Sequence, residues 1–143
     1  MPEHNTSFLL ANALYHGVST DVLVEKGHIK AIGKTSTLAA PSGTAHIDGK
    51  GRILFPGLID AHTHMREPGF EWKEDIASGL AAAASGGFAA VMCMANTSPV
   101  NDKAAVTHLM LDKAAAAHPA GPRLYPVGAL TVGLHGEELA PMR

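Results

Sequence analysis

Residues 53–69, ILFPGLIDAHTHMREPG, change from apolar to polar at Asp60, and this change indicates where a predicted strand ends. The apolar part is typical of a buried strand, so the polar part falls at the carboxyl end of that strand. Side chains two residues apart on a strand leave the same face, so we expect His62 and His64 to project together. The carboxyl ends of strands are where α/β folds carry their sites. The stretch therefore predicts an α/β fold with a site beside the two histidines.

The following residues alternate between helix and strand signals. The alanine-rich residues 74–86 predict a helix, and residues 88–94 form a continuous apolar run that is typical of a strand buried on both faces. A second helix is expected to begin at a cap on Asn101 or Asp102, and a third strand to follow at residues 123–127. This order of strands and helices favours a parallel sheet built from βαβ units.

The first part of the chain has a different pattern, with short apolar runs between glycine-containing turns. Residues 21–24 and 29–32 predict a hairpin, and residues 45–47 predict a further strand, so we interpret residues 1–53 as a small β layer. Residues 54–143 hold about two and a half βα units. An open sheet could stop there, but a closed (β/α)8 barrel needs roughly 250 residues. We therefore expect the chain to be truncated.

Composition excludes several classes of function. Lys plus Arg number 11 and Asp plus Glu number 13 among 143 residues, so no basic excess is present to drive nucleic-acid binding. The chain has no apolar run of the roughly 18 residues that a membrane helix needs, and its acidic, polar start does not resemble a signal peptide. Cys93 is the only cysteine, so we expect a cytoplasmic protein. Nine histidines favour nitrogen and oxygen ligands for any metal, which suits zinc.

Residues 53–101, from ILFPGLIDAHTHMREPG to VMCMANTSPVN, closely resemble the dihydroorotase branch of the amidohydrolase superfamily. The upstream segment NALYHGVSTDVLVEKGHIKAIG is similar to the N-terminal β-sandwich of that superfamily. The resemblance implies that residues 1–53 belong to a composite β-sandwich and residues 54–143 to the first two to three βα units of a metal-dependent (β/α)8 barrel. It also implies the reversible hydrolysis of dihydroorotate to N-carbamoyl-L-aspartate in pyrimidine biosynthesis.

The resemblance further implies roles for particular residues. His62 and His64 would bind one or two zinc ions, and His64, Arg66 and Asn96 would contact the substrate. The chemistry agrees, because a metal acidifies water and polarises a ring carbonyl, and a guanidinium pairs with a carboxylate through two parallel hydrogen bonds. Asp60 shares the register of the histidines, so it is placed to accept a hydrogen bond from a metal-binding imidazole and thereby orient the ring.

The chain supplies only part of such a site. A catalytic zinc usually has three protein ligands, so the remaining ligands and the general base are expected beyond Arg143, and no catalytic residue is assigned within the chain. His135, in a glycine-flanked loop, is interpreted as a solvent or partner contact. His108 and His118 lie on the second predicted helix and are expected to be exposed. Cys93 lies within an apolar strand and is interpreted as a packing residue.

Three functions remain open. The chain is either the N-terminal portion of an active dihydroorotase, inactive alone, or a truncated non-catalytic protein that binds aspartate transcarbamoylase or itself. The third alternative is a hydantoinase or allantoinase type of cyclic amidohydrolase, against which Arg66 argues because a ring without a carboxylate has little use for that cation. In each enzymatic case the partner is a small molecule, and neither nucleic acid nor a membrane is expected.

Overall fold

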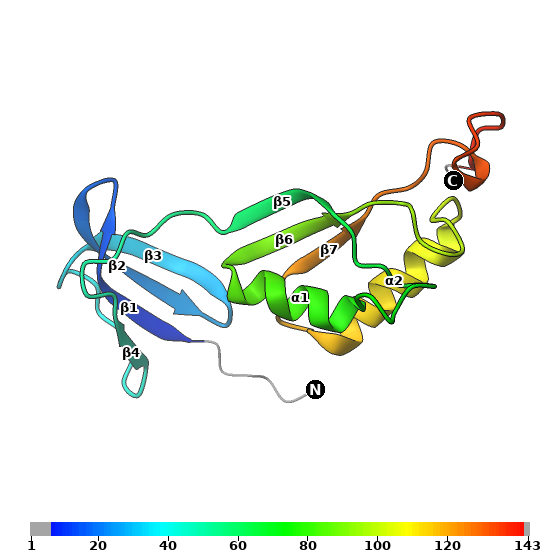
Figure 1. Cartoon of the computed structure of the whole chain (residues 1–143). Helices are drawn as coiled ribbons and strands as arrows, with labels where there is room; N and C mark the ends of the chain where they lie inside the picture. The colour runs from blue at the N-terminus through cyan, green and yellow to red at the C-terminus, as the bar shows by residue number, and fades with distance from the viewer. Residues whose placement is uncertain (1–6, 142–143) are drawn as a thin grey trace. The chain divides into compact units, whose positions relative to one another are not determined.

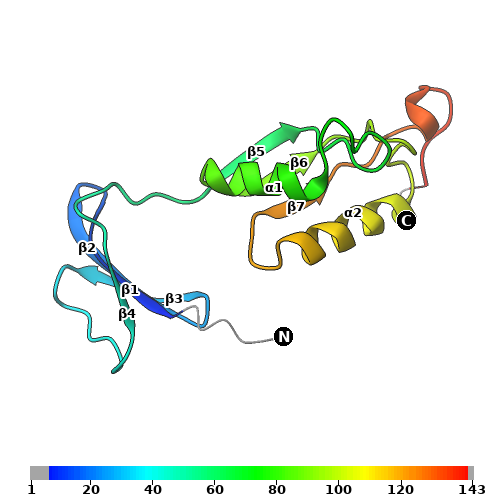
Figure 2. The same cartoon turned by 60° about the horizontal axis from the view of Figure 1, so that its bottom comes forward.

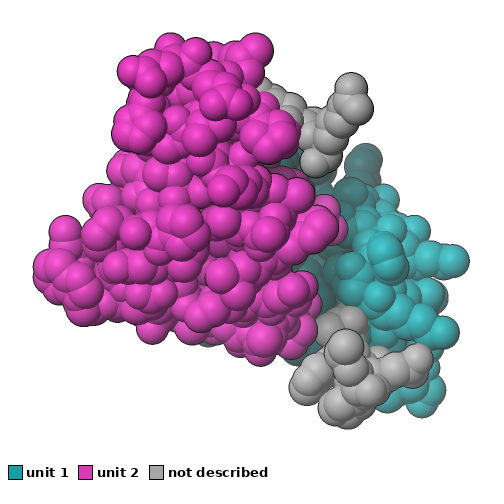
Figure 3. Space-filling model, turned by 90° about the vertical axis from the view of Figure 1, so that its right-hand side faces the viewer, with its two compact units in different colours: residues 1–56 teal, residues 57–143 magenta. Residues whose placement is uncertain are grey.

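The computed structural model describes residues 7–141, so the outer ends of both predicted segments, residues 1–6 and 142–143, lie outside the described residues. The chain divides into two compact units between Pro56 and Gly57. Figure 1 traces the elements of both units, and Figure 3 gives each unit its own colour. The fold is of the mixed α/β class that the sequence predicts.

The first unit is a four-stranded sheet with the strand order β3-β2-β1-β4. Neighbours β1, β2 and β3 are antiparallel, whereas β4 pairs with β1 in parallel. The hairpin predicted at residues 21–24 and 29–32 is the β2–β3 pair, and the strand predicted at 45–47 is β4. The strands of this unit are β1 (Phe8–Tyr15), β2 (Val18–Glu25), β3 (His28–Lys34) and β4 (Ala45–Asp48).

A buried carboxylate holds an irregularity in this sheet. The β1–β2 register shifts between Leu10 and Ala13, and Asn12 at the shift has a positive φ of 58°. The Asp21 side chain accepts hydrogen bonds from the backbone N–H groups of Asn12 (2.9 Å) and Ser36 (2.8 Å). Burial by itself raises the pKa of Asp21, but these hydrogen bonds outweigh burial and lower the pKa below its ordinary value. The carboxylate therefore stabilises the bulge in its charged form.

The second unit is a parallel three-stranded sheet with two helices. The strands lie in the order β5-β6-β7, and Figures 1 and 2 show both helices on the same face of the sheet. No helix within residues 7–141 is long and apolar enough to cross a membrane. The elements are β5 (Leu58–Thr63), α1 (Ile76–Ser85), β6 (Phe88–Cys93), α2 (Ala104–Ala117), β7 (Arg123–Pro126) and the 3-10 turn η1 (Val132–Leu134).

The core lies between this sheet and its helices. Leu80 of α1 and Met110 of α2 are fully buried, and they pack in one cluster with Val91 of β6. The prediction that the strand at 88–94 is buried on both faces is wrong, because Ala89 and Met92 of β6 are exposed. Val91 and Cys93 pack in the core cluster, whereas Ala89 and Met92 reach solvent, so the burial of β6 is incomplete.

The two helices begin in different ways. Asp75 caps α1, and a capping box with Ser78 satisfies two backbone donors of the first turn. The predicted cap of α2 at Asn101 or Asp102 is wrong: α2 begins after Lys103, which makes no capping side-chain bond. Both predicted residues have side chains of the capping type, but those side chains bond the Val127 carbonyl oxygen, the Thr107 hydroxyl and the Gly133 N–H rather than a backbone N–H of the first turn.

The burial of Leu80 leads to a prediction about stability, for which an exposed leucine serves as the control. Leu80→Ala removes a side chain with 0% exposure and should lower the free energy of unfolding by about 2–5 kcal/mol, because it leaves a cavity. Leu109→Ala makes the same chemical change at a position that is 42% exposed and should cost about 1 kcal/mol or less. Urea denaturation of the two variants measures both values, and equal losses would contradict this account of the core.

Candidate functional site

The two predicted metal-binding histidines lie at the carboxyl end of β5. His62 is within the strand and His64 follows its last residue, Thr63. Their ring centroids are 5.3 Å apart with the planes at 67°, so the two imidazoles lie on the same side of the segment, as their spacing predicts. His62 is exposed and His64 is half-buried. A ligand approaching this end of the sheet can reach both rings.

Asn96 contacts one of these rings from the loop after the next strand, β6. It follows β6, and its Oδ1 lies 2.8 Å from Nδ1 of His64. An amide oxygen only accepts hydrogen bonds, so Nδ1 of His64 must carry the proton and donate it. In the neutral ring, a proton on Nδ1 leaves Nε2 of His64 with a free lone pair. An imidazole held in this tautomer by a neighbour is the arrangement in which histidine usually binds a metal.

These three side chains border one hollow at the carboxyl edge of the sheet. Residues at or after the carboxyl ends of all three strands line the hollow, as expected where parallel strands end at the same edge. Its polar side chains are two imidazoles and one amide, and its remaining side chains are apolar. It is lined by His62, His64, Met94, Ala95, Asn96, Val127, Gly128, Ala129, Leu130 and Leu134.

Arg66 and Asp60 are placed differently from the histidines. Arg66 is half-buried and does not line the hollow. Its backbone has a positive φ of 61°, a conformation that costs a non-glycine residue roughly 1 kcal/mol or more. Asp60 contacts the backbone of His62 rather than its ring, because its Oδ1 accepts from the His62 N–H at 3.0 Å. Both predicted roles remain predictions.

The charge of Arg66 affects the thiol of Cys93, the last residue of β6. Burial raises the pKa of the Cys93 thiol, and the hydrogen bond from the Met65 N–H and the charge of Arg66 oppose that rise only in part. Cys93 has 0% exposure and packs in the core, as its interpretation as a packing residue predicts. A buried thiol with a raised pKa is a poor nucleophile.

The other predicted histidines do not join the pair. His108 and His135 are exposed, as expected. His118 was expected to be exposed, but it is half-buried, because its Nε2 lies 3.0 Å from the carbonyl oxygen of Ala77 in α1. Within residues 7–141, no three histidine, cysteine, aspartate or glutamate side chains gather closely enough to hold a metal. The described residues thus offer two imidazoles of the three ligands that a catalytic zinc usually needs.

The loops that follow β5 and β6 are joined to each other. The Ser98 N–H donates to the Pro68 carbonyl oxygen at 2.9 Å, and Gly69 passes so close to Ser98 that a Cβ on Gly69 would overlap the Ser98 carbonyl oxygen. Gly69 also has a φ of +99°, which side chains rarely adopt. The Ser98 contact and the His64–Asn96 bond therefore fix the two loops against each other at two places.

An ion pair between the buried carboxylate of Glu67 and the exposed Lys113 anchors the first of these loops to the helices. Glu67, only 6% exposed, accepts a hydrogen bond from the Ile76 N–H at the start of α1 (2.8 Å) and pairs with Lys113 of α2. The hydrogen bond that Lys113 donates to Glu67, together with the charge of Glu67, raises the pKa of Lys113. No local pattern in the sequence marks Glu67, because its partners lie 9 and 46 residues further along the chain.

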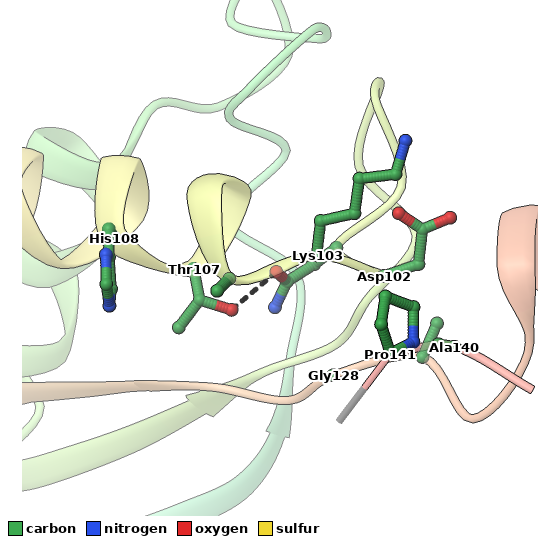
Figure 4. Close-up of a pocket in the computed structure, with 10 residues that line it drawn as sticks. Asp102, Lys103, Thr107, His108, Gly128, Ala140 and Pro141 are labelled. Carbon is green, nitrogen blue, oxygen red and sulfur yellow. Dashed lines mark hydrogen bonds between the residues drawn. The ribbon is translucent and has the colours of Figure 1, made fainter. Parts of the chain in front are cut away.

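A second hollow lies where α2 begins, as Figure 4 shows. It shares Gly128 and Ala129 with the hollow beside the histidines, so the two adjoin. Asn101 borders it and is 1% exposed. The sequence predicts Asn101 or Asp102 as a helix cap and gives no sign of the contacts of Asn101 with the segment after β7. The second hollow is lined by Asn101, Asp102, Lys103, Ala104, Thr107, His108, Gly128, Ala129, Ala140 and Pro141.

Comparison with known proteins shows extensive similarity in sequence. A family model described as dihydro-orotase-like matches residues 51–143. A dihydroorotase of Geobacter metallireducens is 52% identical over 122 residues, covering 85% of this chain and 28% of the relative. A dihydroorotase of Syntrophotalea carbinolica is 52% identical over 129 residues, covering 89% of this chain and 29% of the relative. The chain thus spans less than a third of the length of the curated relatives it matches.

Solved structures are similar in fold. A structure of molinate hydrolase superposes with a TM-score of 0.66 at 20% sequence identity, covering 87% of this chain and 30% of that one. N-isopropylammelide isopropylaminohydrolase from Burkholderia multivorans gives a TM-score of 0.61 at 20% identity, covering 87% of this chain and 37% of that one. At this identity the likeness concerns the fold alone.

The close approach of the loops after β5 and β6 at Gly69 leads to a prediction about stability. Gly69→Ala should lower the free energy of unfolding because the new methyl group forces the loops apart. Gly87→Ala is the control: its φ is +80° but no atom lies within 4 Å of the added Cβ, so it should cost only the backbone term of about 1–2 kcal/mol. Gly69→Ala should cost at least about 1 kcal/mol more.

Urea denaturation gives the two stability values, and hydrogen exchange of the Ser98 amide reports whether the loops have separated. Faster exchange at Ser98 is expected in Gly69→Ala alone. If both variants lose the same stability and leave this amide protected, the loops are not held by close contact at Gly69.

Proposed function

The chain belongs to the dihydro-orotase-like family, and from this we propose that it provides the first βα units of a metal-dependent cyclic amidohydrolase acting on dihydroorotate. One observation carries the proposal: two imidazoles lie on one side of a parallel strand's carboxyl end, and the Asn96 amide fixes the tautomer of one of them. The sequence around this pair matches curated dihydroorotases at 52% identity. Residues 1–53 would then contribute to a composite β-sandwich.

His62 and His64 are the residues that would hold the metal. The donor set fits zinc, because imidazole nitrogen is a preferred zinc ligand and Nε2 of His64 has a free lone pair. One or two ions would be bound, with the remaining ligands supplied by residues outside this chain. When bound, the metal polarises the ring carbonyl and lowers the pKa of water.

The chain's own side chains would bind and orient the substrate. Oδ1 of Asn96 is engaged by His64, which leaves the two Nδ2 hydrogens to donate to the substrate carboxylate. The Arg66 guanidinium would pair with the same carboxylate through two parallel bonds. Holding the carboxylate at two points fixes the orientation of the ring amide that water opens, and this removes part of the entropic barrier. The apolar side chains of Met94, Leu130 and Leu134 would limit access of bulk water.

The alternatives differ in what they require of these residues. A hydantoinase or allantoinase acts on a ring without a carboxylate, so it would give Arg66 no partner. A non-catalytic partner of aspartate transcarbamoylase would need a surface rather than a metal site. Ile59, Met92 and Tyr125 expose apolar surface on the uncovered face of the sheet. Such a surface is compatible with an enzyme in which further structure covers it and with a non-catalytic protein whose partner covers it.

The first test compares the 143-residue chain with the product of the whole open reading frame that encodes it, called here the complete gene product. We expect metal-dependent interconversion of dihydroorotate and N-carbamoyl-L-aspartate by the complete product, and no turnover by the 143 residues of verified mass. His62→Ala should remove about 99% or more of the activity of the complete product. His28→Ala is the control, since His28 is exposed on β3, and it should retain the activity.

Each outcome of this test is informative. Turnover by the 143 residues alone would contradict the expected inactivity. A complete product that hydrolyses hydantoin or allantoin but not dihydroorotate would support the alternative enzyme. A product that hydrolyses none of these rings and copurifies with aspartate transcarbamoylase would support the non-catalytic alternative.

The second test concerns the proposed substrate contact. In the complete product, Arg66→Ala should lower kcat/KM for dihydroorotate about 30-fold or more, chiefly through KM, because truncating one partner of a charged pair costs about 2 kcal/mol or more. Arg66→Lys keeps the charge but not the paired geometry and should give an intermediate value. Arg52→Ala, at an exposed position of the first unit, should change kcat/KM by less than about twofold. Unchanged kinetics in Arg66→Ala would remove Arg66 from the site.

A further inference from the structure

Asn101 is a buried polar residue near the candidate site that takes part in four hydrogen bonds. It is 1% exposed, and both its backbone and its side chain are engaged in hydrogen bonds. The backbone N–H donates to the Ala95 carbonyl oxygen at 3.0 Å, and the backbone carbonyl oxygen accepts from the Ala129 N–H at 2.8 Å. Oδ1 of the side chain accepts from the Thr107 hydroxyl at 2.7 Å, and Nδ2 donates to the Val127 carbonyl oxygen at 3.0 Å.

These four partners lie on three different segments. Ala95 directly precedes Asn96 in the loop after β6, Thr107 is on α2, and Val127 and Ala129 belong to the segment after β7. Figure 4 shows the bond from Thr107 as the dashed line. Ala95, Val127 and Ala129 all line the hollow beside His62 and His64. A single side chain and its peptide groups therefore join two of the three walls of that hollow and tie them to a helix.

This arrangement is not that of a helix cap. Lys103 is the N-cap residue of α2, and Oδ1 of Asn101 accepts from a side-chain hydroxyl rather than from a backbone N–H of the first turn. The neighbouring Asp102 makes a similar long-range contact, since its Oδ2 accepts from the Gly133 N–H at 2.8 Å. Residues with capping side chains are here used to hold the loop after β6 to the segment after β7.

We propose that Asn101 is a positioning residue that places Asn96 and the wall formed by residues 127–130 relative to the two histidines. This inference rests on the proposed function for its effect on the reaction, but its structural part stands on the four hydrogen bonds. Asn101 itself does not line the hollow. Its loss should weaken substrate binding by letting the two walls move, without removing a group that touches the substrate.

The test uses the complete gene product and two pairs of variants. Asn101→Ala removes both side-chain bonds, and Asn101→Asp keeps the acceptor for Thr107 but places an oxygen against the Val127 carbonyl oxygen. Thr107→Val removes the hydroxyl donor at nearly constant shape, whereas Thr107→Ser restores it. Leu80→Ala is the control for lost stability, because Leu80 packs in the core and does not line the hollow.

Two readouts are measured, the exchange of backbone amides and the split between KM and kcat. In Asn101→Ala, the Ala129 amide should exchange at least about tenfold faster, with little change at Val91 in β6. KM for dihydroorotate should rise about tenfold in Asn101→Ala and in Asn101→Asp, and kcat should fall less. Thr107→Val should show a smaller rise, and Thr107→Ser should restore the wild-type KM. Leu80→Ala should leave KM unchanged despite its lower stability.

The outcomes separate this inference from the proposed function. Unchanged exchange at Ala129 in Asn101→Ala overturns the inference whether or not the protein is active. Faster exchange with an unchanged KM shows that Asn101 holds the loop but does not position the site, which also overturns it. If the wild-type product does not act on dihydroorotate, the proposed function fails, and the exchange data alone decide whether Asn101 holds the two walls.

Discussion

The hydrogen bond between the His64 imidazole and the Asn96 amide joins the carboxyl ends of β5 and β6, and the arrangement of the candidate site depends on it. A parallel sheet brings the ends of its strands to one edge, but it does not fix how the loops beyond that edge lie. This bond orients one ring and selects its tautomer. The contact between Ser98 and Pro68 then prevents the loops from separating, and the Glu67–Lys113 pair anchors them to the helices.

The sequence contains the histidine pair and the alternation of strands and helices, because both are local patterns. The period of two places His62 and His64 together without any knowledge of the rest of the chain. The contacts that support the pair are not local: Asn101 reaches Val127, 26 residues away, and Glu67 reaches Lys113, 46 residues away. The incorrect cap at Asn101 has the same origin, because a distant partner, the Val127 carbonyl oxygen, binds the side chain that was expected to cap the helix.

The apolar run at 88–94 predicted burial on both faces, but Ala89 and Met92 reach solvent. A run of this kind reports the environment for which the strand is suited, which is the interior of a closed parallel barrel. Three strands with helices on one face cannot close in that way, so Met92 and Tyr125 stay in contact with solvent. The chain spans 28–29% of the length of the dihydroorotases it matches, which agrees with this excess of exposed apolar surface.

The close passage of Gly69 beside Ser98 has a consequence for building chimeras between relatives. The loop after β5 and the loop after β6 fit each other through backbone atoms, so neither can be exchanged without regard to its neighbour. A crossover placed inside α1 would bring together two loops that had not diverged in the same protein. Crossovers before residue 66 or after residue 101 would transfer both loops as one cassette and preserve their fit.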